Sequence, residues 1–78
     1  MTDEMPSARK RQVLALVAAG WPNKQIAARL GVTSWTIEKH LRQLYRWYRV
    51  PNRAALVRVA LRSGHLTERG IAAVEFDR

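Results

Sequence analysis

A stretch of basic and aromatic residues surrounds a single acid near the middle of the chain. Six side chains in it share one side of a helix, at steps of one to four residues: Trp35, Glu38, Lys39, Arg42, Arg46 and Arg49. Guanidinium and ammonium groups bind phosphates and the acceptor edges of bases, whereas a carboxylate accepts a hydrogen bond from an amino group such as cytosine N4. The chemistry that this pattern favours is noncovalent recognition of a polyanion.

Catalytic and metal-binding patterns are missing from the sequence. The chain has no cysteine, and its two histidines, His40 and His65, lie far apart. We find no paired carboxylates, no nucleophile beside a base and no glycine-rich phosphate loop. We therefore expect no catalytic residues, no metal, no cofactor and no enzyme.

The layout of charge supports a polyanionic partner. The formal net charge is +8, and residues 5–65 hold twelve Lys or Arg residues against one acid, an excess of eleven. A solvated surface without a partner usually mixes both signs. Such an excess attracts polyanions at long range, so we place nucleic acid ahead of a solvated face or an anionic membrane.

The length of the chain and its apolar runs limit the classes of protein to which it can belong. Seventy-eight residues make one small domain. The longest apolar run, VLALVAA at 13–19, is too short to span a bilayer, and the N-terminus lacks the order of a signal peptide. We expect a soluble cytoplasmic protein with no membrane partner.

Proline, glycine and asparagine divide the chain into helical segments. We predict four helices: from the N-cap Ser7 to before Gly20, from about 23 to 30, from the Thr33 cap to about Arg49, and from the Asn52 cap to Gly64. Apolar residues recur at helical spacing in them: Val13, Leu14, Leu16, Val17, Ile26, Ala27, Leu30, Ile37, Leu41, Leu44 and Tyr48.

These segments predict an all-α domain over residues 7–64, after a flexible N-terminus at 1–6 and before a C-terminal tail at 65–78. The tail is ambiguous, because its apolar Ile71, Val74 and Phe76 either extend the core, contact a partner or fray.

The second and third helices, in KQIAARLGVTSWTIEKHL, have the short glycine-containing turn of a helix-turn-helix. A helix in the major groove offers its first turns to bases, and its later residues meet the DNA backbone. We therefore predict base contacts from Trp35, Glu38, Lys39 and Arg42. Backbone contacts are predicted from the helix start and its later turns, at Ser34, Thr36, Arg46 and Arg49.

Glu38 has two compatible interpretations. It can form an ion pair with Arg42 one helical turn later, or it can accept a hydrogen bond from cytosine. Among the other residues, we expect Trp21 to cover the corner between the first two helices and Trp47 to pack on the fourth helix or the tail. His40 is expected to be a partly buried residue with its hydrogen bonds satisfied.

Residues 11–57, RQVLALVAAGWPNKQIAARLGVTSWTIEKHLRQLYRWYRVPNRAALV, resemble the LuxR-type (GerE/NarL/FixJ) helix-turn-helix. The landmarks are AAG, NK-IA--LGVT, TI--H and V-NRAALV, and the likeness extends over about residues 7–63. It implies a four-helix DNA-binding domain of bacterial transcription regulators, whose third helix reads the major groove and whose fourth helix often mediates dimerisation. By position it implies base reading at Glu38, Lys39 and Arg42, and backbone contacts at Thr36 and around Asn23 and Lys24.

A homodimer, at least on DNA, is expected from the fourth helix, with four candidate residues: Leu56, Val57, Ala60 and Leu61. Two positions depart from the family pattern, since Lys10 replaces a usual glutamate and Glu38 a usual lysine. We hypothesise that the two face each other with swapped signs. Only six residues precede the first helix, so we expect a regulator of bacterial or phage type without a sensor domain.

The sequence thus predicts a transcription regulator that binds double-stranded DNA sequence-specifically. The alternative is a protein-binding adaptor or anti-regulator of the same fold that acts on RNA polymerase or another transcription factor. This alternative predicts a large apolar patch on the fourth helix or the tail. Sigma-factor region four and recombinase DNA-binding domains share the motif, but the V-NRAALV segment argues against them.

Overall fold

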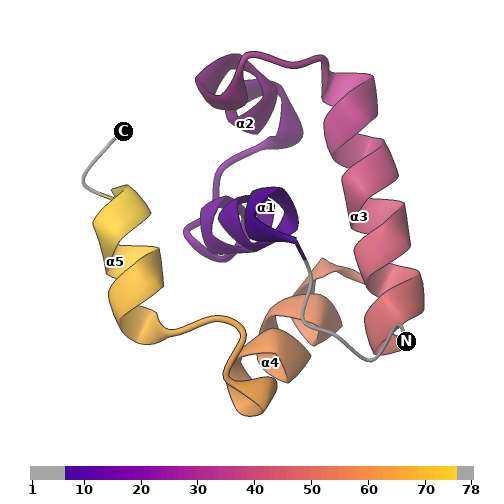
Figure 1. The fold of residues 1–78 in the computed structure, drawn as a ribbon, viewed down its shortest axis with the longest axis vertical. Coiled ribbons are helices and arrows are strands. Elements are labelled where there is room, and N and C mark those ends of the chain that lie inside the picture. The colour runs from indigo at the N-terminus through magenta and orange to yellow at the C-terminus, as the bar shows by residue number, and fades with distance from the viewer. Residues whose placement is uncertain (1–6, 76–78) are drawn as a thin grey trace.

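The computed structural model describes residues 7–75, and all regular structure in that range is helical. The helices follow one another as α1 (Ala8–Ala18), α2 (Asn23–Leu30), α3 (Ser34–Tyr48), α4 (Arg53–Ser63) and α5 (Glu68–Glu75). In Figure 1, α1 lies in the centre, with α3 on one side of it and α5 on the other. The prediction of an all-α fold is confirmed.

Polar side chains at the helix starts explain where the helices begin. Ser7 accepts a hydrogen bond from the amide of Lys10 at 3.2 Å, Thr33 from Thr36 at 3.1 Å, and Asn52 from Ala55 at 2.9 Å. Each bond satisfies an amide that has no partner inside the first helical turn. The predicted starts at Ser7, Thr33 and Asn52 are therefore confirmed.

The turn between α2 and α3 depends on Gly31. Its backbone has φ 73°, in the left-handed region that a Cβ disfavours. The next amide, that of Val32, then donates back to the carbonyl of Ala27 at 2.9 Å, which closes the end of α2. This tight reversal fixes the start of α3 beside α2.

The core is formed by the apolar stripes of the helices around α1. Buried in it are Val13, Leu14, Leu16, Val17, Trp21, Ile26, Ala27, Ile37, Leu41, Leu44, Leu56, Ala60 and Leu66. Leu30 and Tyr48, also predicted for the core, are half-buried and pack against it. One face of α3 is therefore buried against the other helices, and this packing fixes which face of α3 is directed outward.

The ambiguous tail contains a fifth helix, so the four predicted helices are incomplete. The side chain of Thr67 accepts from the amide of Gly70 at 3.0 Å, and α5 then packs against α1 through the half-buried Ile71 and Val74. Leu66, just before it, is buried, and its amide donates to the carbonyl of Ala60 at 3.1 Å. The tail thus extends the core; Phe76, the third apolar residue considered there, lies outside the described residues.

The described residues hold neither a membrane-spanning helix nor a cluster of metal ligands. No helix in them combines the length and apolar character that crossing a membrane requires. No group of three or more His, Asp or Glu side chains in them could hold a metal ion.

Candidate nucleic-acid interface

The outer face of α3 is open to solvent along its whole length. The side chain of Trp35 is 62% exposed, while Ile37 and Leu44 on the opposite face are buried. Five charged side chains share the exposed face and are themselves exposed: Glu38, Lys39, Arg42, Arg46 and Arg49. The predicted base-reading residues therefore lie together on one accessible surface.

The exposed tryptophan has a cationic neighbour. The Nζ atom of Lys39 lies 5.6 Å from the centre of the Trp35 ring, within the range of a cation–π contact. This contact orders two long side chains at the start of α3, at the end that a groove-binding helix offers to bases.

The first turn of α3 is held by a pair of threonines. The hydroxyl groups of Thr33 and Thr36 lie 3.0 Å apart, and Thr33 also caps the amide of Thr36. Ser34 and Thr36 are half-buried at this end of the helix. Both predicted backbone contacts thus stand at the helix start, although the hydroxyl of Thr36 already has a partner.

Asn23 and Lys24 begin α2 on one flank of α3. Lys24 is exposed, whereas the amide oxygen of Asn23 accepts a hydrogen bond from Nη1 of Arg53 at 2.7 Å. The other guanidinium nitrogen, Nη2, donates to the carbonyl of Trp21 at 3.1 Å. Arg53 therefore ties the start of α4 to the start of α2, and Asn23 keeps its amide N–H groups for another acceptor.

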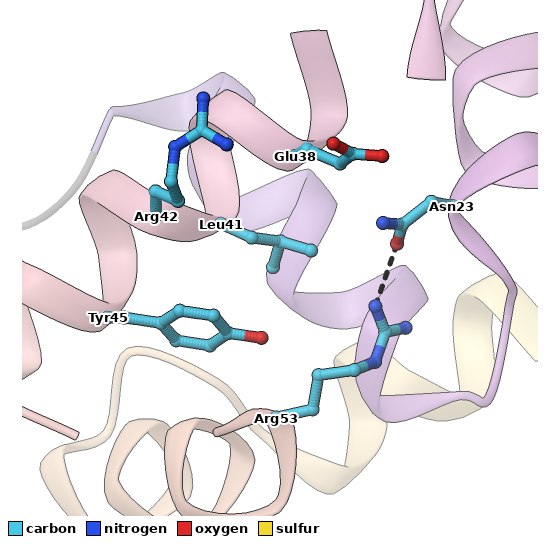
Figure 2. Close-up of a pocket in the computed structure, with 6 residues that line it drawn as sticks. All are labelled: Asn23, Glu38, Leu41, Arg42, Tyr45 and Arg53. Carbon is cyan, nitrogen blue, oxygen red and sulfur yellow. Dashed lines mark hydrogen bonds between the residues drawn. The ribbon is translucent and has the colours of Figure 1, made fainter. Parts of the chain in front are cut away.

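A hollow of about 290 Å³ lies on this flank. Figure 2 shows its lining, formed by Asn23, Glu38, Leu41, Arg42, Tyr45 and Arg53. In this view the carboxylate of Glu38 points towards Asn23, and no hydrogen bond is drawn between that carboxylate and the guanidinium of Arg42. The hollow brings together the beginnings of α2 and α4 and the middle of α3.

Neither expected partner pairs with Glu38. The structure gives no ion pair between Glu38 and Arg42 or Lys10, all three of which are described residues, so both expectations are wrong. After the larger effect of burial, the positive charge of Lys10 instead lowers the pKa of His40. Successive helical residues are about 100° apart, so His40 lies about 200° around α3 from Glu38. The carboxylate therefore faces the solvent-open hollow without a cation bound to it.

His40 lies on the opposite flank of α3 and is half-buried. Its Nδ1 atom is buried and has no hydrogen-bond partner within the described part of the chain, so the expectation of a satisfied histidine is wrong. Burial lowers the pKa of His40, and the positive charges of Lys10, Arg9 and Lys39 lower it further. The start of α1 therefore brings cations close to this flank.

The four dimerisation candidates divide between the core and the surface. Leu56 and Ala60 are fully buried in the monomer, so the prediction that these two contact a second copy is corrected. Val57 is half-buried and Leu61 is 37% exposed. Of the four predicted dimerisation residues, Val57 and Leu61 are therefore the two that are accessible on the surface of α4.

The aromatic residues lie largely where the sequence suggested. Trp21 is buried between α1 and α2. Trp47 is 39% exposed, and its ring meets that of Tyr48 edge-on at 4.7 Å and lies 5.6 Å from that of His65. The hydroxyl of Tyr48 lies 2.6 Å from Nδ1 of His65, which joins the end of α3 to the segment between α4 and α5.

Sequence reasoning missed two sets of residues beside α3. Arg53 was included only as part of the V-NRAALV landmark, because its partners Asn23 and Trp21 lie 30 and 32 residues earlier in the chain and leave no local signal. Of the three consecutive cations, Arg9 and Arg11 were counted only in the total charge, and Lys10 was considered only as a partner of Glu38.

Comparison with known proteins places this geometry in a family. Residues 6–60 match the family described as bacterial regulatory proteins, luxR family. The chain is 48% identical over 54 residues, 69% of its length, to the probable transcriptional regulatory protein SgaR of Hyphomicrobium methylovorum. It is 40% identical over 62 residues, 80% of its length, to the transcriptional regulatory protein MctR of Rhizobium johnstonii.

The likeness covers only part of those relatives. The chain spans 26% of the length of SgaR and 29% of that of MctR. No solved structure matches it. The matched residues contain α1, the helix-turn-helix of α2 and α3 and most of α4, with the caps at Ser7, Thr33 and Asn52 and every buried core residue except Leu66. The chain therefore belongs to the LuxR family of bacterial regulatory proteins.

Proposed function

We propose that this chain binds double-stranded DNA sequence-specifically as part of a transcription regulator, with α3 in the major groove. Trp35, Glu38, Lys39 and Arg42 contact base edges in this proposal. Contacts to the DNA backbone come from α2 and from the rest of α3, at Asn23, Lys24, Ser34, Thr36, Arg46 and Arg49.

The observation that carries this proposal is the uncovered outer face of α3. Its cationic side chains are exposed, while the apolar face behind them is sealed in the core. An α-helix with its side chains is about 10–12 Å across, and the major groove is about 12 Å wide, so such a face fits the groove. The names of SgaR and MctR, both regulators of transcription, agree with this use.

The unpaired carboxylate of Glu38 supports base reading. A carboxylate without a bound cation costs binding energy near phosphates, unless an amino group on a base, such as cytosine N4, donates to it. Glu38 and Arg42 both line the hollow without an ion pair between them, so each side chain is available for a different base.

The exposed apolar surface supports this proposal over the protein-binding adaptor. An adaptor acting on RNA polymerase or another regulator requires a large apolar patch on α4 or α5. Of the large apolar side chains described in these two helices, Leu61 alone is more than a third exposed. Leu61 with the half-buried Val57 suits a small contact between two copies on DNA.

Selection of binding sites from a randomised duplex library tests this function. We expect a defined consensus from the parent chain, and a palindrome if two copies bind through α4. Enrichment of no sequence, with duplex binding equal for every oligonucleotide, would contradict sequence-specific recognition.

Two arginine variants test the division of α3 into base and backbone contacts. Arg42→Ala should lose discrimination at one base pair of the consensus, by about 1–3 kcal/mol. Arg46→Ala serves as the matched control and should weaken binding to all sequences alike, since phosphate contacts carry no sequence information. Competition titrations with single-base variants of the consensus measure both effects, and identical behaviour of the two variants would refute the division.

A further inference from the structure

Three consecutive cations begin α1: Arg9, Lys10 and Arg11, which we name the α1 basic cluster. Arg9 and Arg11 are exposed, and Lys10 is half-buried. None of the three forms an ion pair with any residue that the structure describes. The cluster is therefore a cationic surface outside the face of α3 that reads bases in our proposal.

The cluster lies against the flank of α3 that is opposite to the hollow. α1 packs on α3, and Figure 1 shows the first turns of α1 directed at the middle of α3. After burial, the positive charges of Lys10 and Arg9 lower the pKa of His40. Burial raises the pKa of Tyr48, two turns further along α3, and the nearby charge of Arg11 opposes that rise. Glu38 and Tyr45, by contrast, line the hollow on the other flank.

The position of the α1 basic cluster is electrostatically unfavourable in the protein without a ligand. The start of a helix carries the positive end of its dipole, so cations there are unfavourable and anions favourable. The first turn of α1 holds no acid, and Lys10 continues the inward-facing stripe of Val13, Leu14 and Val17 at helical spacing. An anion placed against the cluster would relieve both the dipole and the mutual repulsion of the cations.

A duplex bound by α3 supplies such an anion. Because the helix nearly fills the major groove, one sugar–phosphate strand passes along each of its flanks. The beginning of α2, with Asn23 and Lys24, stands on the hollow side of α3. We propose that the α1 basic cluster binds the phosphates of the other strand, so that the domain holds both edges of the groove; this inference rests on the proposed function.

Salt dependence of duplex binding tests the inference in the full 78-residue chain, in which Asp3 and Glu4 remain ahead of the cluster. The test variant is R9A/R11A. The matched control is R58A/R62A, which removes two exposed arginines from α4, a helix that leads away from α3 in Figure 1. Both variants lower the net charge by the same amount, and their affinities are titrated on the selected duplex from about 50 to 200 mM salt.

The cluster should change the salt slope without changing base preference. Each lost phosphate contact makes the slope of log Kobs against log salt concentration less negative by about 0.9, so R9A/R11A should make it less negative by about 1–2 and R58A/R62A should leave it unchanged. A second pair, R9Q/R11Q, repeats the measurement with polar side chains, and thermal melting checks that every variant is folded.

The outcomes separate this inference from the proposed function. An unchanged slope in R9A/R11A, an equal change of slope in both double variants, or an altered consensus in R9A/R11A overturns the α1 contact, although sequence-specific binding by the parent chain still stands. Absence of duplex binding by the parent chain overturns the proposed function and the α1 contact with it.

Discussion

Arg49 holds a backbone conformation that favours glycine. It follows α3 with φ 58°, whereas the left-handed residues after α1, α2 and α4 are all glycines. A side chain in this conformation costs roughly 1–2 kcal/mol. Strain of this kind is often retained where the side chain has a function, which agrees with a phosphate contact from Arg49.

Arg49→Gly should therefore change stability and DNA affinity in opposite directions. Relief of the strain, reduced by the greater entropy of unfolded glycine, should raise the free energy of unfolding by about 0.5–1 kcal/mol. Affinity for every duplex should fall, and the slope of log Kobs against log salt concentration should become less negative by about 1. Urea denaturation and duplex titration measure the two effects.

Arg49→Ala is the control, because it removes the guanidinium and keeps the strain. It should lose affinity to the same extent without the gain in stability. If Arg49→Gly binds DNA as tightly as the parent chain, the side chain has no contact with phosphate.

His40 should make the fold less stable as the pH falls. The pKa of His40 is lowered in the folded protein, first by burial and then by nearby cations, from an unfolded value of 6.5. The unfolded chain then binds the proton more readily, so this contribution is lost as the pH falls through 6.5 towards the lower folded pKa. In urea denaturation between pH 7.5 and 5, His40→Gln should lose less stability than the parent chain; equal losses would contradict this role.

At the scale of elements, Arg53 is the link that holds α2 and α4 together. Its half-buried guanidinium donates to Asn23 and to the carbonyl of Trp21. Hydrogen bonds from a charged group contribute about 1.5–3 kcal/mol, so Arg53→Ala should lower the free energy of unfolding by that amount. Urea denaturation measures the loss.

Two further variants isolate the geometry of this link. Arg53→Lys keeps the charge but not the planar fork of donors, so it should recover little of the stability. Arg58→Ala removes an exposed arginine from the same helix and should change stability by less than about 0.5 kcal/mol. Recovery of full stability in Arg53→Lys would show that charge alone matters at this position.

The starts and ends of the first four helices could be predicted because single residues determine them. Caps such as Ser7, Thr33 and Asn52 and the turn at Gly31 act within a few residues of themselves. α5 was harder to predict, because its eight residues gain much of their stability from packing on α1 and from the buried Leu66 beside it. Spacing identified the exposed face of α3 for the same local reason.

Contacts between elements could not be predicted in the same way. The side chain of Glu38 could turn to Arg42 or to α2, and only the position of Asn23 and Arg53 across the hollow distinguishes these directions. The apolar spacing of α4 likewise could not separate Leu56 and Ala60, which are buried, from Leu61, which is exposed. Both questions depend on how helices distant in sequence pack together.

For the whole molecule, the excess of positive charge predicts a steep dependence of DNA binding on salt. Contacts to roughly four to six phosphates per protomer give a slope of log Kobs against log salt concentration near −4 to −5. Titrations of the parent chain with its selected duplex at several salt concentrations measure this slope. A flat response would remove the electrostatic basis of the proposed function.

The position of α5 has a practical consequence. α1 separates α5 from α3, so α5 lies on the far side of the molecule from the face proposed to enter the groove (Figure 1). A fluorophore attached through a cysteine placed at the exposed Ala73 would stand clear of a bound duplex. Because the chain has no cysteine of its own, such labelling would be site-specific, and it would report the rotation of the complex without disturbing the groove.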